Sequence, residues 1–167
     1  GHSLIKAMMK ELNSPLGGEM SAHIFFADKY YGFDDGIYAS VRFLEIMQKT
    51  GKSAAELLDE LPKMVSSPEH KIAVDDRKKF MLIEQLKNLV APAPAFAEET
   101  QKIGEAGKGH AILVDGIRME RNFGWWLVRA SNTGANIVAR YEADTEGNFA
   151  KIRSDLTAHL AKIGLSL

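Results

Sequence analysis

The spacing of hydrophobic residues predicts a helix near the start of the chain, followed by an extended segment. Leu4, Met8 and Leu12 lie four positions apart, which is typical of the apolar face of an amphipathic helix. Ser3 stands where an N-cap for that helix would be. The apolar run 23–26 is expected to be a short strand or another extended segment.

Two more helices are expected before residue 62, each with a recognisable cap. Asp34 or Asp35 caps the first, and Ser53 and Glu56 form an S-x-x-E capping box at the start of the second. Because a single strand cannot build a complete sheet, residues 1–65 are predicted to be the remnant of a larger α/β domain. Exposed apolar helix faces would then favour self-association. The apolar face of the first of these helices consists of Ile37, Val41, Leu44 and Met47.

Residues 66–167 form the second predicted domain, which follows a stretch rich in proline and serine at 62–68. The expected order is strand, helix, hairpin, strand, strand, helix, without the regular alternation of a parallel sheet. We therefore expect an α+β fold with helices backing an antiparallel sheet. Asp115-Gly116 predicts a two-residue hairpin turn, and the prolines of 91–94 interrupt a helix. The two helix faces consist of Phe80, Ile83, Leu86 and Val90, and of Phe149, Ile152, Leu156, Leu160 and Ile163.

Composition and charge narrow the classes of function. The net charge is −1, so the chain lacks the general basic field that non-specific nucleic-acid binding uses. Cysteine is absent, which excludes disulfides and thiolate sites and suits a cytoplasmic location. No apolar run is long enough for a membrane span, so no membrane partner is expected. The chain opens without methionine, and we expect it to be a piece of a longer protein.

Two polar loops carry the candidate chemistry. In the first loop, residues 16–23, Glu19, Ser21 and His23 alternate, so that in an extended segment they share one face and can converge on sugar hydroxyls. An ordinary solvated glycine turn is the alternative. In the second loop, residues 128–134, a guanidinium, two hydroxyls and an amide are suited to phosphate oxygens, and an ordinary polar hairpin loop is the alternative. These donors belong to Arg129, Ser131, Asn132 and Thr133.

Other features point more weakly to function. Asp34-Asp35-Gly36 lacks the twelve-residue spacing of a Ca²⁺ loop, so helix capping is the better interpretation. Trp125 and Trp126 must point to opposite faces of a strand, so one is expected in the core and the other at a surface that a partner protein can use.

At its loops the chain resembles the α-D-phosphohexomutases, most closely their bacterial phosphomannomutase/phosphoglucomutase branch. Residues 18–23, G-E-M-S-A-H, are similar to the sugar-recognition motif G-E-M-S-G-H, and residues 129–133, R-A-S-N-T, match the phosphate-binding motif. Residues 1–6 and 33–37 are similar to two further family segments. The sequence departs from the family pattern at Ala22, where glycine is usual, and at Gly134-Ala135, where proline is usual.

The resemblance implies a mutase that interconverts hexose 1-phosphate and hexose 6-phosphate through a hexose 1,6-bisphosphate. Such enzymes have four domains, and this chain corresponds to the end of the third, residues 1–65, and to the fourth, residues 66–167. The fourth domain implies a four-stranded antiparallel sheet with two helices, a TBP-like fold. The family's phosphoserine loop and its Mg²⁺ loop of aspartates are missing from this sequence, so the resemblance implies no metal site here and no catalysis by this chain alone.

The resemblance also implies roles for individual residues. Glu19 and Ser21 would hold sugar hydroxyls of mannose or glucose phosphates. His23 and His2 would lie near the reacting centre and assist proton transfer. A free-standing phosphosugar- or anion-binding module is the alternative function. The phosphate that is not transferred would be held by Arg129, Ser131, Asn132, Thr133 and Gly134.

Overall fold

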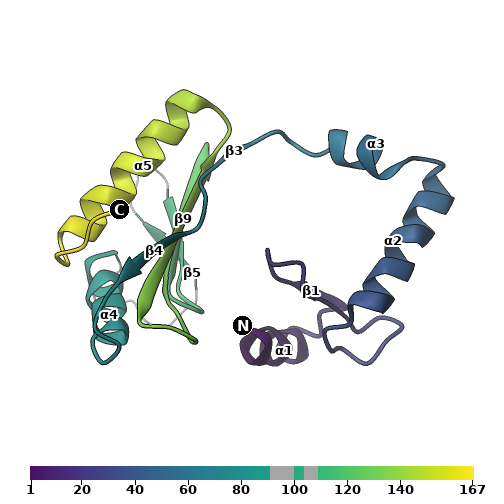
Figure 1. The fold of residues 1–167 in the computed structure, drawn as a ribbon, viewed down its shortest axis with the longest axis horizontal. Helices are drawn as coiled ribbons and strands as arrows, with labels where there is room; N and C mark the ends of the chain where they lie inside the picture. Colours follow the sequence, from purple (N-terminus) through teal and green to yellow (C-terminus); the bar gives the residue numbers. More distant parts are fainter. Residues whose placement is uncertain (91–99, 104–108) are drawn as a thin grey trace. The chain divides into compact units, whose positions relative to one another are not determined.

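The computed structural model describes residues 1–90, 100–103 and 109–167, which form two compact units (Figure 1). Unit 1 is Gly1–Pro62 and unit 2 is Lys63–Leu167. Every helix among the described residues is too short or too polar to cross a bilayer. The helix interruption expected at 91–94 lies outside the described residues.

Unit 1 is built from helices around one small hairpin. Strands β1 and β2 pair antiparallel, with Gly17 opposite Phe25. Helix α1 packs closely on this hairpin: a Cβ at Gly17 would lie 2.6 Å from the sulfur of Met9. Phe25, 1% exposed, and Met9 are the buried hydrophobic residues of the unit. Its elements are α1 (His2–Glu11), β1 (Leu16–Gly18), β2 (Ile24–Phe26), α2 (Gly36–Thr50) and α3 (Ala54–Asp59).

Two of the three helix caps predicted for unit 1 occur in the structure. Asp35 caps α2 by accepting a hydrogen bond from the Tyr38 amide, and Ser53 and Glu56 form the expected capping box of α3. The expected Ser3 cap is wrong, because α1 starts at His2 and Ser3 lies inside it. The exposed apolar face of α2 is as expected: none of its residues is buried, and Ile37 is 82% exposed.

Unit 2 confirms an α+β fold with an antiparallel sheet backed by two helices. Within the described residues the sheet has seven strands, where the resemblance implied four. Three short strands extend the central four: β3 and β4 pair one after the other with β9, and β5 pairs with β6. The elements are β3 (Val65–Ser66), β4 (His70–Ala73), α4 (Lys79–Val90), β5 (Thr100–Ile103), β6 (Gly109–Ile112), β7 (Ile117–Arg121), β8 (Gly124–Ala130), β9 (Asn136–Ala143) and α5 (Glu146–Ala161).

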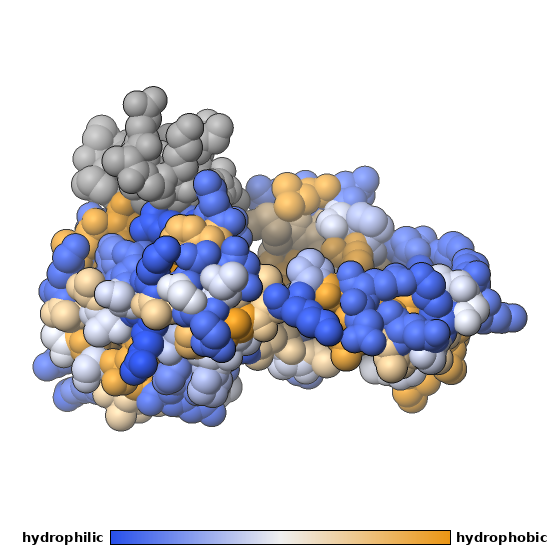
Figure 2. Space-filling view, turned by 90° about the horizontal axis from the view of Figure 1, so that it is seen from above, coloured by the Kyte–Doolittle hydropathy of each residue, from blue (hydrophilic) through white to orange (hydrophobic). Residues whose placement is uncertain are grey.

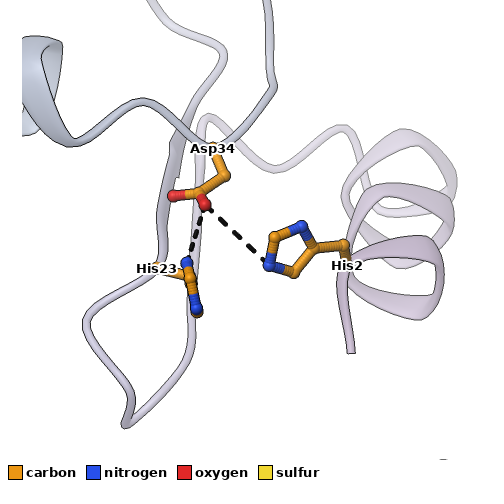
Figure 3. A group of neighbouring side chains, drawn as sticks. All are labelled: His2, His23 and Asp34. Carbon is orange, nitrogen blue, oxygen red and sulfur yellow. Dashed lines mark hydrogen bonds and ion pairs between the residues drawn. The ribbon is translucent and has the colours of Figure 1, made fainter. Parts of the chain in front are cut away.

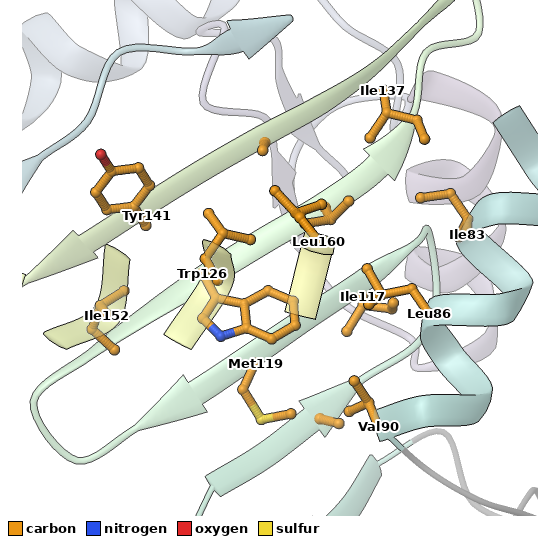
Figure 4. Packing of buried hydrophobic residues seen from close by; sticks show 14 of the residues in the cluster. Ile83, Leu86, Val90, Ile117, Met119, Trp126, Ile137, Tyr141, Ile152 and Leu160 are labelled. Atoms are coloured by element: carbon orange, nitrogen blue, oxygen red, sulfur yellow. The ribbon is translucent and has the colours of Figure 1, made fainter. Parts of the chain in front are cut away.

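The core of unit 2 lies between the sheet and the two helices, α4 and α5 (Figure 4). Residues of β8 alternate between the two faces of the sheet, so Trp126 and Val128 are fully buried. Trp125 faces the other way, as predicted, and the Arg118 guanidinium lies 4.0 Å from its ring centroid. The indole N–H of Trp126 donates to Asp155 of α5 at 2.9 Å, so this buried donor is satisfied.

Two details of unit 2 differ from expectation. The hairpin between β6 and β7 has a longer turn, since β6 ends at Ile112 and β7 begins at Ile117. A tight type I′ turn needs positive φ at both central residues, but Gly116 has φ 82° and Asp115 does not share this conformation. On α4, Phe80 was expected to be buried and is 58% exposed, whereas Lys79 is 5% exposed.

Candidate ligand-binding loops

The first loop joins β1 to β2 and is closed by its own backbone. The Glu19 amide donates to the carbonyl of His23 at 2.9 Å, and the Ala22 amide donates to the carbonyl of Glu19 at 3.0 Å. Closing so short a loop requires a left-handed residue, and Ala22 takes that conformation with φ 64°. Ala22 is thus a non-glycine residue at the position where the family motif has glycine.

The side chains of the first loop do not all face one point. Ser21 donates its hydroxyl to Glu19 Oε2 at 3.4 Å, so these two lie together as expected. His23 instead turns toward Asp34, with Nδ1 2.7 Å from Oδ2 (Figure 3). His2, from α1, brings its ring to 4.7 Å from that of His23, measured between centroids.

Asp34 is a residue of this site that sequence reasoning missed. It was considered for helix capping, but Asp35 caps α2, which leaves the Asp34 carboxylate to meet both imidazoles. The other acid nearby is Glu19, whose buried Oε1 makes no hydrogen bond and lies 3.8 Å from His2 Nε2. The structure therefore gathers two histidines and two carboxylates around the first loop.

The second loop joins β8 to β9 and is organised by Ser131. The Ser131 hydroxyl oxygen accepts hydrogen bonds from the amides of Thr133 and Gly134, at 3.3 and 3.1 Å, and Ser131 is 8% exposed. These two amides therefore support the turn, while the Ser131 hydroxyl proton stays available to a ligand. The side chains of Asn132 and Thr133 are exposed.

Arg129 stands at the end of β8, on the face of the sheet opposite the helices. Its side chain is 30% exposed, and Nη1 lies 3.6 Å from Asp115 Oδ2. A charged pair at this separation on a partly exposed surface is weak. An incoming phosphate can therefore compete for the guanidinium, which is suited to bidentate binding of phosphate oxygens.

Lys79 adds a buried positive charge behind the second loop. Its ammonium donates to the carbonyl of Gly134 at 3.1 Å and pairs with Asp76 at 2.7 Å. Sequence reasoning missed this residue, although Lys79 continues the helical spacing of Ile83 and Leu86 toward the N-terminus of α4. Such a lysine holds the turn, because its ammonium satisfies the Gly134 carbonyl while Asp76 balances its charge.

Two family models match the chain, one after the other. Residues 1–65 match "Phosphoglucomutase/phosphomannomutase, alpha/beta/alpha domain III". Residues 69–159 match "Phosphoglucomutase/phosphomannomutase, C-terminal domain". The chain belongs to the phosphoglucomutase/phosphomannomutase family. The resemblance that the loop motifs indicate is thereby confirmed.

Relatives in this family are similar to the chain along almost all of its length. A phosphomannomutase/phosphoglucomutase from Pseudomonas putida is 40% identical over 163 residues, which are 98% of this chain and 32% of that protein. One from Pseudomonas aeruginosa is 39% identical over 167 residues, 100% of this chain and 33% of that protein. A crystal structure of a family protein from Burkholderia thailandensis has 37% identity and a TM-score of 0.74, covering 98% of this chain and 31% of that one. The chain therefore spans about a third of the length of these relatives.

The Mg²⁺ implied by the family resemblance does not fit the described residues. Mg²⁺ requires oxygen ligands in near-octahedral geometry. The group that can ligate a metal among the described residues is His2, His23 and Asp34, and two of its three donors are nitrogens. No Mg²⁺ site is therefore assigned to this part of the phosphoglucomutase/phosphomannomutase fold.

Proposed function

We propose that this chain is the sugar- and phosphate-binding part of a phosphohexomutase. The parent enzyme interconverts hexose 1-phosphate and hexose 6-phosphate, with mannose or glucose as the sugar, through a hexose 1,6-bisphosphate. The observation that carries the proposal is the pair of polar loops, one within each family match and each with a donor set suited to its part of a phosphosugar.

In this proposal the second loop binds the phosphate that is not transferred. Arg129 supplies a bidentate positive group, while Ser131, Asn132 and Thr133 donate further hydrogen bonds. Gly134 serves through its carbonyl, which receives the Lys79 ammonium and fixes the turn. A clamp on the distant phosphate positions the reacting hydroxyl and supplies binding energy in both orientations of the bisphosphate.

The first loop holds the sugar and a candidate proton acceptor. Glu19 and Ser21, which hydrogen-bond to each other, are placed to exchange that contact for sugar hydroxyls. When His23 donates from Nδ1 to Asp34, its Nε2 is left unprotonated and can accept a proton from a hydroxyl. Asp34 is thus a positioning residue for His23, and the neighbouring His2 ring is placed to assist.

Turnover requires groups that this sequence lacks. Phosphoryl transfer needs a phosphoryl donor and a cation that stabilises developing charge, and neither the serine loop nor the aspartate loop of the family occurs here. We therefore expect this chain to bind phosphosugars and to show no mutase activity by itself.

The test is an NMR titration of the chain with glucose 1-phosphate and with mannose 1-phosphate. We expect saturable amide shifts at residues 129–134, and we expect them to be lost in Arg129→Ala. The matched control is Arg153→Ala, which removes an exposed arginine of α5 from the same unit. Shifts that persist in Arg129→Ala, or that vanish equally in Arg153→Ala, would contradict the assigned clamp.

The alternative of a free-standing phosphosugar module predicts a different result. A module evolved to act alone would bind phosphosugars at physiological concentrations without other domains. Binding of that strength, together with a reading frame that starts just before Gly1, would favour the module. A reading frame that continues upstream through a serine loop and an aspartate loop would favour the mutase.

A further inference from the structure

The side chains around the first loop form a compact set of metal-ligating atoms. His2, His23 and Asp34 each offer one ligand atom, and these atoms lie within 4.8 Å of one another. They come from three different segments, namely α1, the end of the first loop and the turn before α2 (Figure 3). Glu19 Oε1, which is buried and makes no hydrogen bond, lies beside this group, 3.8 Å from His2 Nε2.

The separations of these atoms suit a tetrahedral ion. Zn²⁺ bound to nitrogen and oxygen at about 2.0–2.1 Å places neighbouring ligand atoms roughly 3.4 Å apart in a tetrahedron. His2 Nε2 lies 3.9 Å from Asp34 Oδ2 and 3.8 Å from Glu19 Oε1, whereas His23 Nδ1 lies 2.7 Å from Asp34 Oδ2. His2 Nε2 and Asp34 Oδ2 would approach by about 0.5 Å, and His23 Nδ1 and Asp34 Oδ2 would separate by roughly 0.7 Å, to reach the tetrahedral value.

The donor types also select the metal. Two imidazoles and one carboxylate suit Zn²⁺ and the neighbouring transition metals, and they do not suit Mg²⁺, which requires oxygen ligands. On binding, the metal takes the place of the proton between His23 Nδ1 and Asp34, and that proton moves to Nε2 as the neutral ring changes tautomer.

The geometry points to a transition-metal site of the Zn²⁺ class at His2, His23 and Asp34, with the fourth position of the tetrahedron left to water. The site differs from the Mg²⁺ that the family resemblance implies, and the sequence did not predict it. Its existence does not depend on the proposed mutase function. Where that function holds as well, the bound ion occupies the nitrogen and carboxylate that position the proton acceptor, so the metal acts as an inhibitor.

The experiment measures Zn²⁺ binding by calorimetry and Co²⁺ binding by visible absorption, on the full chain near neutral pH. We expect one Zn²⁺ per chain and an intense Co²⁺ spectrum of the tetrahedral type. Each of His2→Gln and His23→Gln should weaken binding by about tenfold or more, since even changes outside the ligand shell cost 10–100-fold. The control is His70→Gln, because His70 stacks on Tyr141 in unit 2 and is not among the ligands.

Each outcome decides the matter. Loss of binding in both ligand variants, with normal binding in His70→Gln, supports the site. Equal binding by all variants overturns it, as does a weak octahedral Co²⁺ spectrum. Binding that is lost in His2→Gln and unchanged in His23→Gln also overturns it, because His23 is then not a ligand. His2 is on an exposed face of α1, so His2→Gln keeps the test valid if His23→Gln disturbs the loop.

Discussion

Replacing Ala22 by glycine should stabilise the first loop. Ala22 has φ 64°, a left-handed conformation that costs an L-residue roughly 1–2 kcal/mol. Glycine adopts this conformation freely, but it also raises the conformational entropy of the unfolded chain, which lowers the stabilisation by about 0.4–1 kcal/mol. The side chain of Ala22 is exposed, so no packing is lost. The net expectation for Ala22→Gly is a stabilisation of about 1 kcal/mol.

Amide hydrogen exchange measures the stability of the first loop separately from that of the rest of the chain. The amides of Glu19 and residue 22 donate the two hydrogen bonds that close the loop, so their protection reports its opening. A gain of about 1 kcal/mol corresponds to about fivefold slower exchange at both amides.

The matched control is Ala7→Gly, also an exposed alanine of unit 1 but inside helix α1. Here glycine should destabilise by about 1 kcal/mol and speed the exchange of the α1 amides. Faster or unchanged exchange at Glu19 in Ala22→Gly would refute the reasoning, because alanine would then be unstrained in the loop.

Three further changes have expected outcomes. The hydrogen bond with Asp155 raises the pKa of His159. The contribution of this pair to the free energy of unfolding of unit 2 should therefore be fully present below about pH 6.5 and be lost as pH rises through that raised pKa. Urea unfolding followed by tryptophan fluorescence at about pH 6 and about pH 8.5 should show this slope, and His159→Gln should remove it. Lys79→Met leaves the Gly134 carbonyl without its ammonium partner. In the NMR titration with glucose 1-phosphate, this variant should keep its fold and bind severalfold more weakly. Unchanged affinity would refute the role given to Lys79. Hydrophobic residues lie on the surface of unit 1 (Figure 2), with Val41 56% and Leu44 61% exposed on α2. Sedimentation should therefore show self-association of the chain. The double change Val41→Lys and Leu44→Lys should reduce this self-association, and the control change Ala158→Lys on α5 should leave it unaltered.

Local patterns predicted the regular elements well. The capping box at Ser53 and Glu56 and the alternation of Trp125 and Trp126 depend on neighbours in the chain, and both occur in the structure as expected. The spacing of Ile152, Leu156 and Leu160 likewise identified the buried face of α5, because helical periodicity alone decides which side chains share a face.

Predictions failed where distant contacts decide the outcome. Lys79 is buried and Phe80 exposed because a carbonyl from the second loop and Asp76 satisfy the lysine charge, and helical spacing does not contain that information. The turn at Gly116 is set by β8: a Cβ there would lie 2.3 Å from the carbonyl oxygen of Val128. Two-residue turn statistics do not describe such a close approach.

In the candidate site, too, local patterns were predictable from the sequence and contacts between distant residues were not. Its residue types were visible in the sequence because short motifs carry them. The partnership of His23 with Asp34, eleven residues later, depends on how the first loop turns back toward the start of α2. The role of Ser131 in holding the amides of Thr133 and Gly134 likewise became visible only with the folded turn.

The central claim is that the two loops divide the phosphosugar between them. The most direct test compares amide shifts of the chain in the presence of inorganic phosphate and of glucose 1-phosphate. We predict that inorganic phosphate shifts residues 129–134 and leaves residues 19–23 unchanged, whereas glucose 1-phosphate shifts both loops. Shifts by glucose 1-phosphate in neither loop, or shifts by inorganic phosphate that center on residues 19–23, would contradict the account.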